Sequence, residues 1–147
     1  RLPGPDGEPL DITPVCVGNP HVVVWTKDPN MDDLRRIGPF VATHPAIAHG
    51  TNMQLATVVG PHECRALIWE RGVGHTWASG TSSCAVATAA VVRKAVNPGL
   101  ITVHLEGGDL HVNVAADLRV ELRGPVEEVA EGRLTPAFVA KLAGIGV

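Results

Sequence analysis

The feature that most constrains this chain is a run of small apolar residues with almost no polar side. From Cys84 to Val92 the sequence reads Cys-Ala-Val-Ala-Thr-Ala-Ala-Val-Val. Alanine strongly favours helix, and a helix that is apolar all round is buried on every side. Short β-branched stretches lie before and after it in sequence. We therefore predict an α+β fold in which a curved sheet or barrel wraps one central buried helix, from Gly80 to about Lys94.

The ends of this helix carry recognisable signals. Thr81 or Ser82 is expected to cap its amino end, since a hydroxyl accepts hydrogen bonds from free backbone N–H groups. Asn97-Pro98-Gly99 stops the helix. Three of its residues should be nearly free of solvent contact: Cys84, Ala87 and Val91.

Other patterns place the remaining elements. The amino-terminal stretch 3–14, rich in Pro, Gly and Asp, should begin as loop. Apolar residues every third position predict a short helix over 28–37, capped by Asp28, and Thr135-Pro136 should begin a terminal helix. Gly107-Gly108 within 106–109 indicates a hairpin turn. Strands are expected at 15–25, with a break at 18–21, and at 53–59, 64–69, 100–105, 110–114, 118–122 and 126–134.

Size and charge restrict the function classes. The 147 residues suffice for one domain with a real core, and we expect 1–147 to form a single domain. The net charge of −3, with both signs interspersed, argues against nucleic acid or an acidic membrane surface as a partner. No apolar run is long enough for a membrane span. The chain lacks an initiator methionine and a signal peptide, which suggests processing or a fragment of a longer protein.

The cysteine count points to a reducing compartment. Cys16, Cys64 and Cys84 are odd in number and without paired spacing, so they form no disulfide framework. We expect a cytoplasmic protein, with each cysteine buried as a small hydrophobic residue.

Three segments have the character of a site. Asn19 and His21 lie between two apolar strands, and Asn52 stands at the head of another. In composition alone, each also fits an ordinary turn. The third segment, 70–84, runs from a strand through a glycine turn into the start of the buried helix.

The third segment suits a zwitterionic ligand. A loop of small residues that leads into a helix presents free N–H groups at the positive end of the helix dipole, where a carboxylate or phosphate binds. Arg71 adds a cation that can hold a carboxylate at two points, and Glu70 can hold an ammonium group. A glycine-rich turn with an incidental ion pair is the competing interpretation.

Several motifs, in order and spacing, resemble the second half of diaminopimelate epimerases. They are Gly18-Asn19-Pro20-His21, Arg36-Ile37-Gly38-Pro39, His44-Pro45, Thr51-Asn52, Trp69-Glu70-Arg71-Gly72-Val73-Gly74, Gly107-Gly108-Asp109-Leu110 and Gly124-Pro125-Val126-Glu127. The resemblance covers nearly the whole chain. It implies a two-domain protein of which this chain is the carboxyl-terminal half.

The resemblance also implies an activity: epimerisation of an amino acid, LL- to meso-diaminopimelate in lysine and peptidoglycan biosynthesis, without a cofactor or metal. In that mechanism one cysteine thiolate removes the α-proton and a cysteine thiol on the opposite face returns one. Carried over by position, the catalytic residues are Ser79, Glu70 and His21. The substrate-binding residues are Asn19, Asn52, Arg71, Gly80 and Thr81.

The sequence departs from the family pattern at the catalytic loop. Where the family carries Glu, its second catalytic Cys and Gly, this chain has His75, Ser79 and Ser82. A serine hydroxyl is a far weaker acid than a thiol and needs a neighbouring base to act, a role open to His75. Cys84, inside the helix, is no ready substitute.

Three functions therefore stay open: an epimerase with impaired or altered activity, a one-base dehydratase or isomerase of the proline racemase type, and a non-catalytic amino-acid-binding domain. The expected partners are a small amino acid and an amino-terminal half of the same protein, with a homodimer as a further option.

Overall fold

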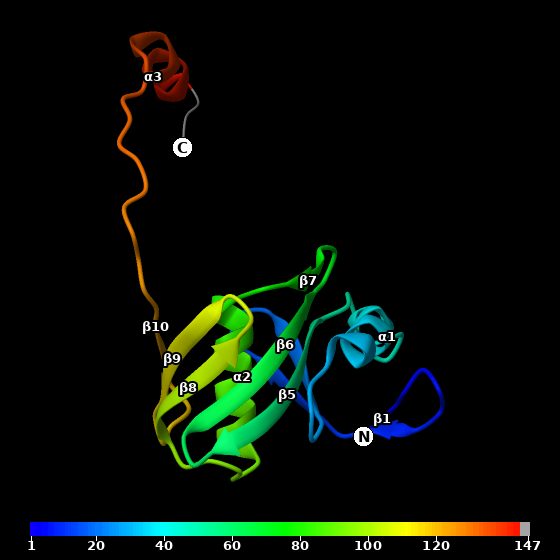
Figure 1. Ribbon diagram of the computed structural model, residues 1–147. Helices are drawn as coiled ribbons and strands as arrows, with labels where there is room; N and C mark the ends of the chain where they lie inside the picture. The colour runs from blue at the N-terminus through cyan, green and yellow to red at the C-terminus, as the bar shows by residue number, and fades with distance from the viewer. Residues whose placement is uncertain (145–147) are drawn as a thin grey trace.

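The computed structural model describes residues 1–144 and surrounds one helix, α2 (Gly80–Val92), with a curled sheet (Figure 1). The sheet order is β10-β9-β8-β6-β5-β4-β3, with β7 paired to β6. Its strands are β3 (Ile12–Cys16), β4 (Pro20–Trp25), β5 (Asn52–Gly60), β6 (Glu63–Glu70), β7 (Gly74–Thr76), β8 (Gly99–Leu105), β9 (Gly108–Val114) and β10 (Val120–Arg123). The predicted α+β fold, a curved sheet around a central helix, is confirmed.

Side chains that alternate in direction along the strands belong to two different cores, one on each face of the sheet. Val23 and Ala56 belong to the core around α2, with the other inward residues of β6, β8 and β9. Their neighbours Val24 and Leu55 point the opposite way, into a second core under α1 (Met31–Ala42). Side chains of successive strand residues point to opposite faces, so the sheet between the two helices is apolar on both sides.

Helix α2 is buried as predicted, with differences at its ends. Ala87 is fully buried and Val91 is 9 % exposed, but Cys84 is half-buried and Val92 is 52 % exposed. The helix ends at Val92 with Arg93 as its C-cap. Its amino-terminal cap is Ser79, not Thr81 or Ser82, because helical geometry begins at Gly80 and the hydroxyl one residue earlier faces the free N–H groups.

Helix α1 is longer than predicted and starts later. Asn30, not Asp28, is the N-cap, accepting a hydrogen bond from the Asp33 backbone N–H at 2.9 Å. The helix continues to Ala42 through Pro39. A Cβ on Gly38 would lie 2.6 Å from the Trp69 indole, so the glycine lets α1 approach β6 closely.

The amino-terminal stretch contains more strand than predicted. β1 (Leu2–Pro3) pairs with β2 (Pro9–Leu10), and β3 begins at Ile12. The predicted break at 18–21 is shorter, because β4 starts at Pro20 and His21 lies in a strand instead of a turn. Among the helices of the described residues, none is long and apolar enough to cross a bilayer.

The carboxyl-terminal segment leaves the sheet (Figure 1). The strand predicted at 126–134 is wrong: residues 124–135 form neither helix nor strand, since no other strand lies beside them to complete a ladder. The terminal helix is confirmed as α3 (Pro136–Ala143), capped by Thr135. Residues 124–144 are exposed throughout.

Candidate functional site

Several of the predicted site residues lie at one end of the sheet, where β4, β5 and β6 run side by side. His21 and Asn52 are directly paired between the parallel strands β4 and β5. Glu70 ends β6, one position beyond the Met53–Trp69 pair, so it stands beside Asn52. Segments remote in sequence therefore converge on a single end of the curled sheet.

His21 is the buried centre of this group, with 1 % of its surface exposed. Its Nε2 lies 2.9 Å from Asn19 Oδ1 and its Nδ1 lies 3.0 Å from Gln54 Nε2. Burial lowers the pKa of the imidazole, while the charge of Glu70 opposes that change. The pKa of His21 therefore lies below its ordinary value of 6.5, which favours the neutral ring.

Asn52 and Arg71 are joined by a hydrogen bond. The Arg71 backbone N–H donates to Asn52 Oδ1 at 2.9 Å, and the Asn52 amide donates to the Pro20 carbonyl at 3.5 Å. The Arg71 guanidinium donates to the His49 carbonyl. Within residues 1–144 no carboxylate forms an ion pair with Arg71, which is exposed at the surface. The side chain is thus anchored at one nitrogen and available to an anionic ligand.

Ser79 has a structural role that its sequence position did not reveal. Its Oγ accepts from the Ser82 backbone N–H at 3.5 Å, and its carbonyl accepts from the Ser83 hydroxyl at 3.0 Å. The N–H groups of Gly80 and Thr81 fall in the first turn, where a helix offers no internal acceptor. Half-buried Gly80 and exposed Thr81 therefore present two backbone donors next to the hydroxyl.

His75 does not bond to Ser79. It lies on β7 opposite Trp69, and its Nε2 is 2.5 Å from Glu106 Oε2 in the β8–β9 turn. In the described part of the chain, the serine hydroxyl contacts the Ser82 amide and no side-chain base.

The cysteines differ from the expectation that all three are buried. Cys64 is fully buried, and burial raises the pKa of its thiol to about 11. Cys84 is half-buried, and burial raises its thiol pKa as well. Cys16 is exposed, because β3 is an edge strand and its outward positions face solvent. All three are free.

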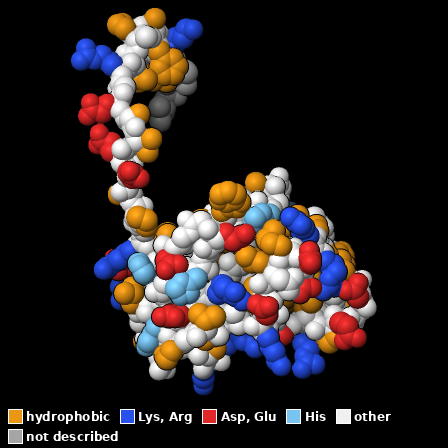
Figure 2. Space-filling model, viewed as in Figure 1, with side chains coloured by type: hydrophobic (Ala, Val, Ile, Leu, Met, Phe, Trp, Pro, Cys, Tyr) orange, Lys and Arg blue, Asp and Glu red, His pale blue; other side chains and the backbone are white. Residues whose placement is uncertain are grey.

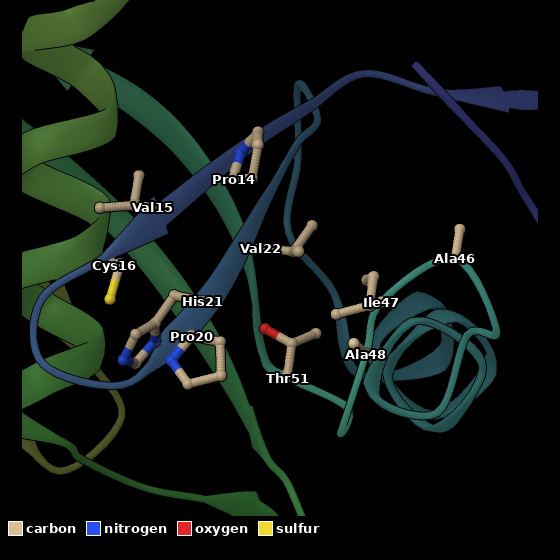
Figure 3. A pocket seen from close by; sticks show the side chains of 10 residues that line it. All are labelled: Pro14, Val15, Cys16, Pro20, His21, Val22, Ala46, Ile47, Ala48 and Thr51. Atoms are coloured by element: carbon tan, nitrogen blue, oxygen red, sulfur yellow. The ribbon is translucent and has the colours of Figure 1, made fainter.

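A cavity of about 500 Å³ lies beside the group and not within it. It is bounded by β3, the start of β4, Thr51 and the loop 46–48 that follows α1 (Figure 3). Of the eight candidate residues only His21 lines it. The shared cleft expected around Asn19, Asn52 and Arg71 at the start of α2 stays a prediction.

Two residues of the site were not singled out from sequence as contacts. Gln54 is fully buried on β5, and its Nε2 lies 3.0 Å from both His21 Nδ1 and Ser82 Oγ. A signal for it existed: it is the one amide in the apolar stretch Met53–Val59, two residues after Asn52 and so on the same strand face. Ser82 was considered only as a possible helix cap and as a departure from the family pattern.

Comparisons with known proteins agree on one family. A sequence profile described as diaminopimelate epimerase matches residues 13–129. A diaminopimelate epimerase of Desulfitobacterium hafniense is 40% identical over 129 residues, 88% of this chain and 45% of its own length. One from a Methylobacterium species is 41% identical over 143 residues, 95% of this chain and 48% of its own. The chain therefore spans less than half the length of these relatives.

Solved structures of the same fold are more distant in sequence. A PhzC/PhzF phenazine biosynthesis protein from Clostridium difficile is 18% identical, with a TM-score of 0.63, and the match covers 93% of this chain and 50% of that one. A probable proline racemase from Agrobacterium radiobacter, solved with carbonate, is 17% identical with a TM-score of 0.53, over 78% and 41% of the chains. At this identity the likeness concerns the fold.

Proposed function

Because the chain belongs to the diaminopimelate epimerase family, we propose that it supplies one half of a cofactor-independent amino-acid epimerase that converts LL- to meso-diaminopimelate. The observation that carries the proposal is that His21, Asn52 and Glu70 lie at neighbouring positions of β4, β5 and β6, with Arg71 bonded to Asn52 and His21 linked through Gln54 to the first turn of α2. A zwitterion with a second carboxylate needs anion sites and an ammonium site close together, and this end of the sheet offers both kinds.

Each group has a distinct task in the proposed site. The first-turn N–H groups of Gly80 and Thr81 bind the α-carboxylate, because a helix amino terminus favours negative charge. They also stabilise the carbanionic state formed when the α-proton leaves. Asn19, Asn52 and Arg71 hold the distal end of the substrate, and Glu70 attracts an ammonium group.

Proton transfer is the step of the proposed reaction that this chain alone supports least. Epimerisation needs an acid and a base on opposite faces of the α-carbon. Ser79 would serve one face, but a hydroxyl acts only with a base beside it, and His75 pairs with Glu106. Cys84 has a raised thiol pKa. We propose that the chain alone turns over poorly and that the second proton-transfer group lies on an amino-terminal half.

Two observations support an amino-terminal half of the same protein as the partner. The chain covers 45% and 48% of the relatives' lengths. Its carboxyl-terminal segment also leaves large apolar side chains exposed, visible on α3 and along the preceding segment (Figure 2). They are Val126, Val129, Leu134, Phe138, Val139 and Leu142. A homodimer would cover the same surface. The three free thiols support a reducing, cytoplasmic location.

Exchange of the substrate α-hydrogen tests the function. Proton NMR of LL-diaminopimelate in deuterated water should show no measurable exchange with the chain alone. Joined to an amino-terminal half that carries the partner cysteine, Ser79→Cys should raise exchange by about 10²-fold or more, the usual effect of a positioned proton-transfer group. Ser79→Ala is the matched control and should give no gain.

Other outcomes identify the competing functions. Brisk exchange by the chain alone would overturn the two-base argument. No gain from Ser79→Cys in the complete protein, together with formation of a dehydrated product, would identify one-base chemistry at the Ser79 hydroxyl. Tight binding without any exchange would identify an amino-acid-binding domain.

A further inference from the structure

Gln54 joins two parts of the site that are otherwise separate. Its Nε2 lies 3.0 Å from His21 Nδ1 on β4 and 3.0 Å from Ser82 Oγ in the first turn of α2. Gln54, His21 and Ser82 are all at most 1 % exposed. Water therefore does not compete for these hydrogen bonds, and the three side chains form one connected polar unit between strand and helix.

The pattern of donors and acceptors fixes the state of the histidine ring. Asn19 Oδ1, 2.9 Å from Nε2, can only accept, so Nε2 carries the proton. In a neutral ring Nδ1 is then an acceptor, and it faces the Gln54 Nε2 group, which donates. Both hydrogens of that amide group are used, one toward His21 and one toward the Ser82 hydroxyl.

The opposite orientation of the Gln54 amide fits less well. It would place Oε1 against Nδ1 and require a proton there as well as on Nε2, which means a charged ring in a buried position. Burial opposes that charge by lowering the pKa of His21. Gln54 Oε1 itself is buried and has no partner within the described residues, so the amide is held by its donor side.

We infer that Gln54 is a positioning residue of this site: it holds His21 as the neutral Nε2–H tautomer and ties that ring to the start of α2 through Ser82. This inference rests on the proposed function for its catalytic meaning. Neutral His21 then donates to Asn19, which orients the Asn19 amide for the substrate. The hydrogen bond from Gln54 to Ser82 fixes the position of the Asn19 amide relative to the start of α2. The backbone donors of Gly80 and Thr81 lie there, directly after the Ser79 cap.

Nitrogen NMR of the histidine rings tests the inference without any substrate. The chain has seven histidines, and the two neutral tautomers and the imidazolium have distinct ring ¹⁵N shifts. His21 should appear as neutral Nε2–H, with Nδ1 at the position of a hydrogen-bonded acceptor. In Gln54→Leu, Nδ1 should move to the position of an acceptor without a donor.

Gln54→Glu is the sharper variant because it replaces the donor by a carboxylate of the same length. Both ring nitrogens should then carry protons, and the His21 pKa should rise by about 1–3 pH units, as for other groups beside an opposite charge. Two other titratable groups lie near the ring: the carboxylate of Glu70 on β6 and the thiol of Cys16 on β3. Val59→Glu, at an exposed position of the same strand, adds the same charge away from the ring and should leave His21 unchanged.

The possible outcomes distinguish a failure of this inference from a failure of the proposed function. A wild-type ring protonated at Nδ1 overturns the inference by itself, even if no Gln54 variant folds. An unchanged His21 pKa in folded Gln54→Glu also overturns it. If the ring responds as expected but the protein binds no diaminopimelate, the positioning stands and the proposed function fails.

Discussion

At His21, burial and a nearby charge act on the same ring in opposite directions. Burial favours the neutral form, whereas the charge of Glu70 favours the charged form, and burial prevails. A buried neutral histidine makes folding sensitive to acid, because the unfolded chain binds a proton that the folded chain resists. The residue therefore links the site to the stability of the fold.

The sign of this effect can be predicted. Since the folded pKa of His21 lies below the unfolded value near 6.5, the stabilisation is complete above that value. It is lost as the pH falls toward the lower, folded pKa. The free energy of unfolding, from urea titrations, should decrease by up to about 1.4 kcal/mol per pH unit in this window. His21→Gln should flatten the dependence, while His111→Gln, at an exposed position, should retain it.

Ser79 is the second residue with a measurable structural role. As the N-cap of α2, its hydroxyl satisfies the Ser82 N–H. Ser79→Ala should lower the free energy of unfolding by about 0.5–2 kcal/mol, the usual cost of a lost cap. Thr81→Ala, two residues further along the chain and exposed, should be close to neutral. Equal stability of both variants in chemical denaturation would show that Ser79 does not cap the helix.

Among the elements, α1 depends on a close approach to the sheet. Its packing against β6 requires Gly38, because any side chain there meets the Trp69 indole. The interior Pro39 removes one helical hydrogen bond, so the helix relies on its buried residues Leu34, Ile37 and Val41 for stability.

Gly38→Ala should therefore destabilise the protein by about 1–3 kcal/mol, typical of overpacking. Tryptophan fluorescence during urea unfolding measures the change, since Trp69 is in the affected contact. Gly132→Ala, where nothing lies within 4 Å, is the matched control and should change stability little. A neutral Gly38→Ala would mean that α1 does not pack on Trp69 as described.

At the scale of the whole molecule, the sheet around α2 and the carboxyl-terminal segment behave differently. Residues 2–123 share two cores, whereas 124–144 are exposed and contribute no residue to either core. An extended backbone without ladder hydrogen bonds fits a protease site readily.

Limited trypsin digestion should therefore cut after Arg133, and after Arg123 at the end of β10, well before arginines in the interior of the sheet, such as Arg65. Mass spectrometry identifies the fragments, and the remaining 1–123 should melt near the temperature of the full chain, because both cores are retained. In the presence of an amino-terminal half that covers the segment, Arg133 should be protected. Early cleavage after Arg65 would contradict the division into a folded part, residues 2–123, and an exposed segment, residues 124–144.

The sequence by itself determined the elements whose signals are local. The central helix followed from consecutive apolar residues, because helical hydrogen bonds join positions four apart and need no distant partner. The hairpin turn between β8 and β9 and the cap at Thr135 were local for the same reason. The spacing of Asn19, His21, Asn52, Glu70 and Arg71 was enough to indicate the family.

Only the tertiary structure decided which distant residues meet. The strand expected at 126–134 failed because a strand needs a neighbour, and propensity does not supply one. Ser79 became the cap because of where helical geometry starts. The contact between His21 and Gln54 spans 33 positions, and that between Gln54 and Ser82 spans 28. Such a network depends on how β4, β5 and α2 pack together, which no local pattern encodes.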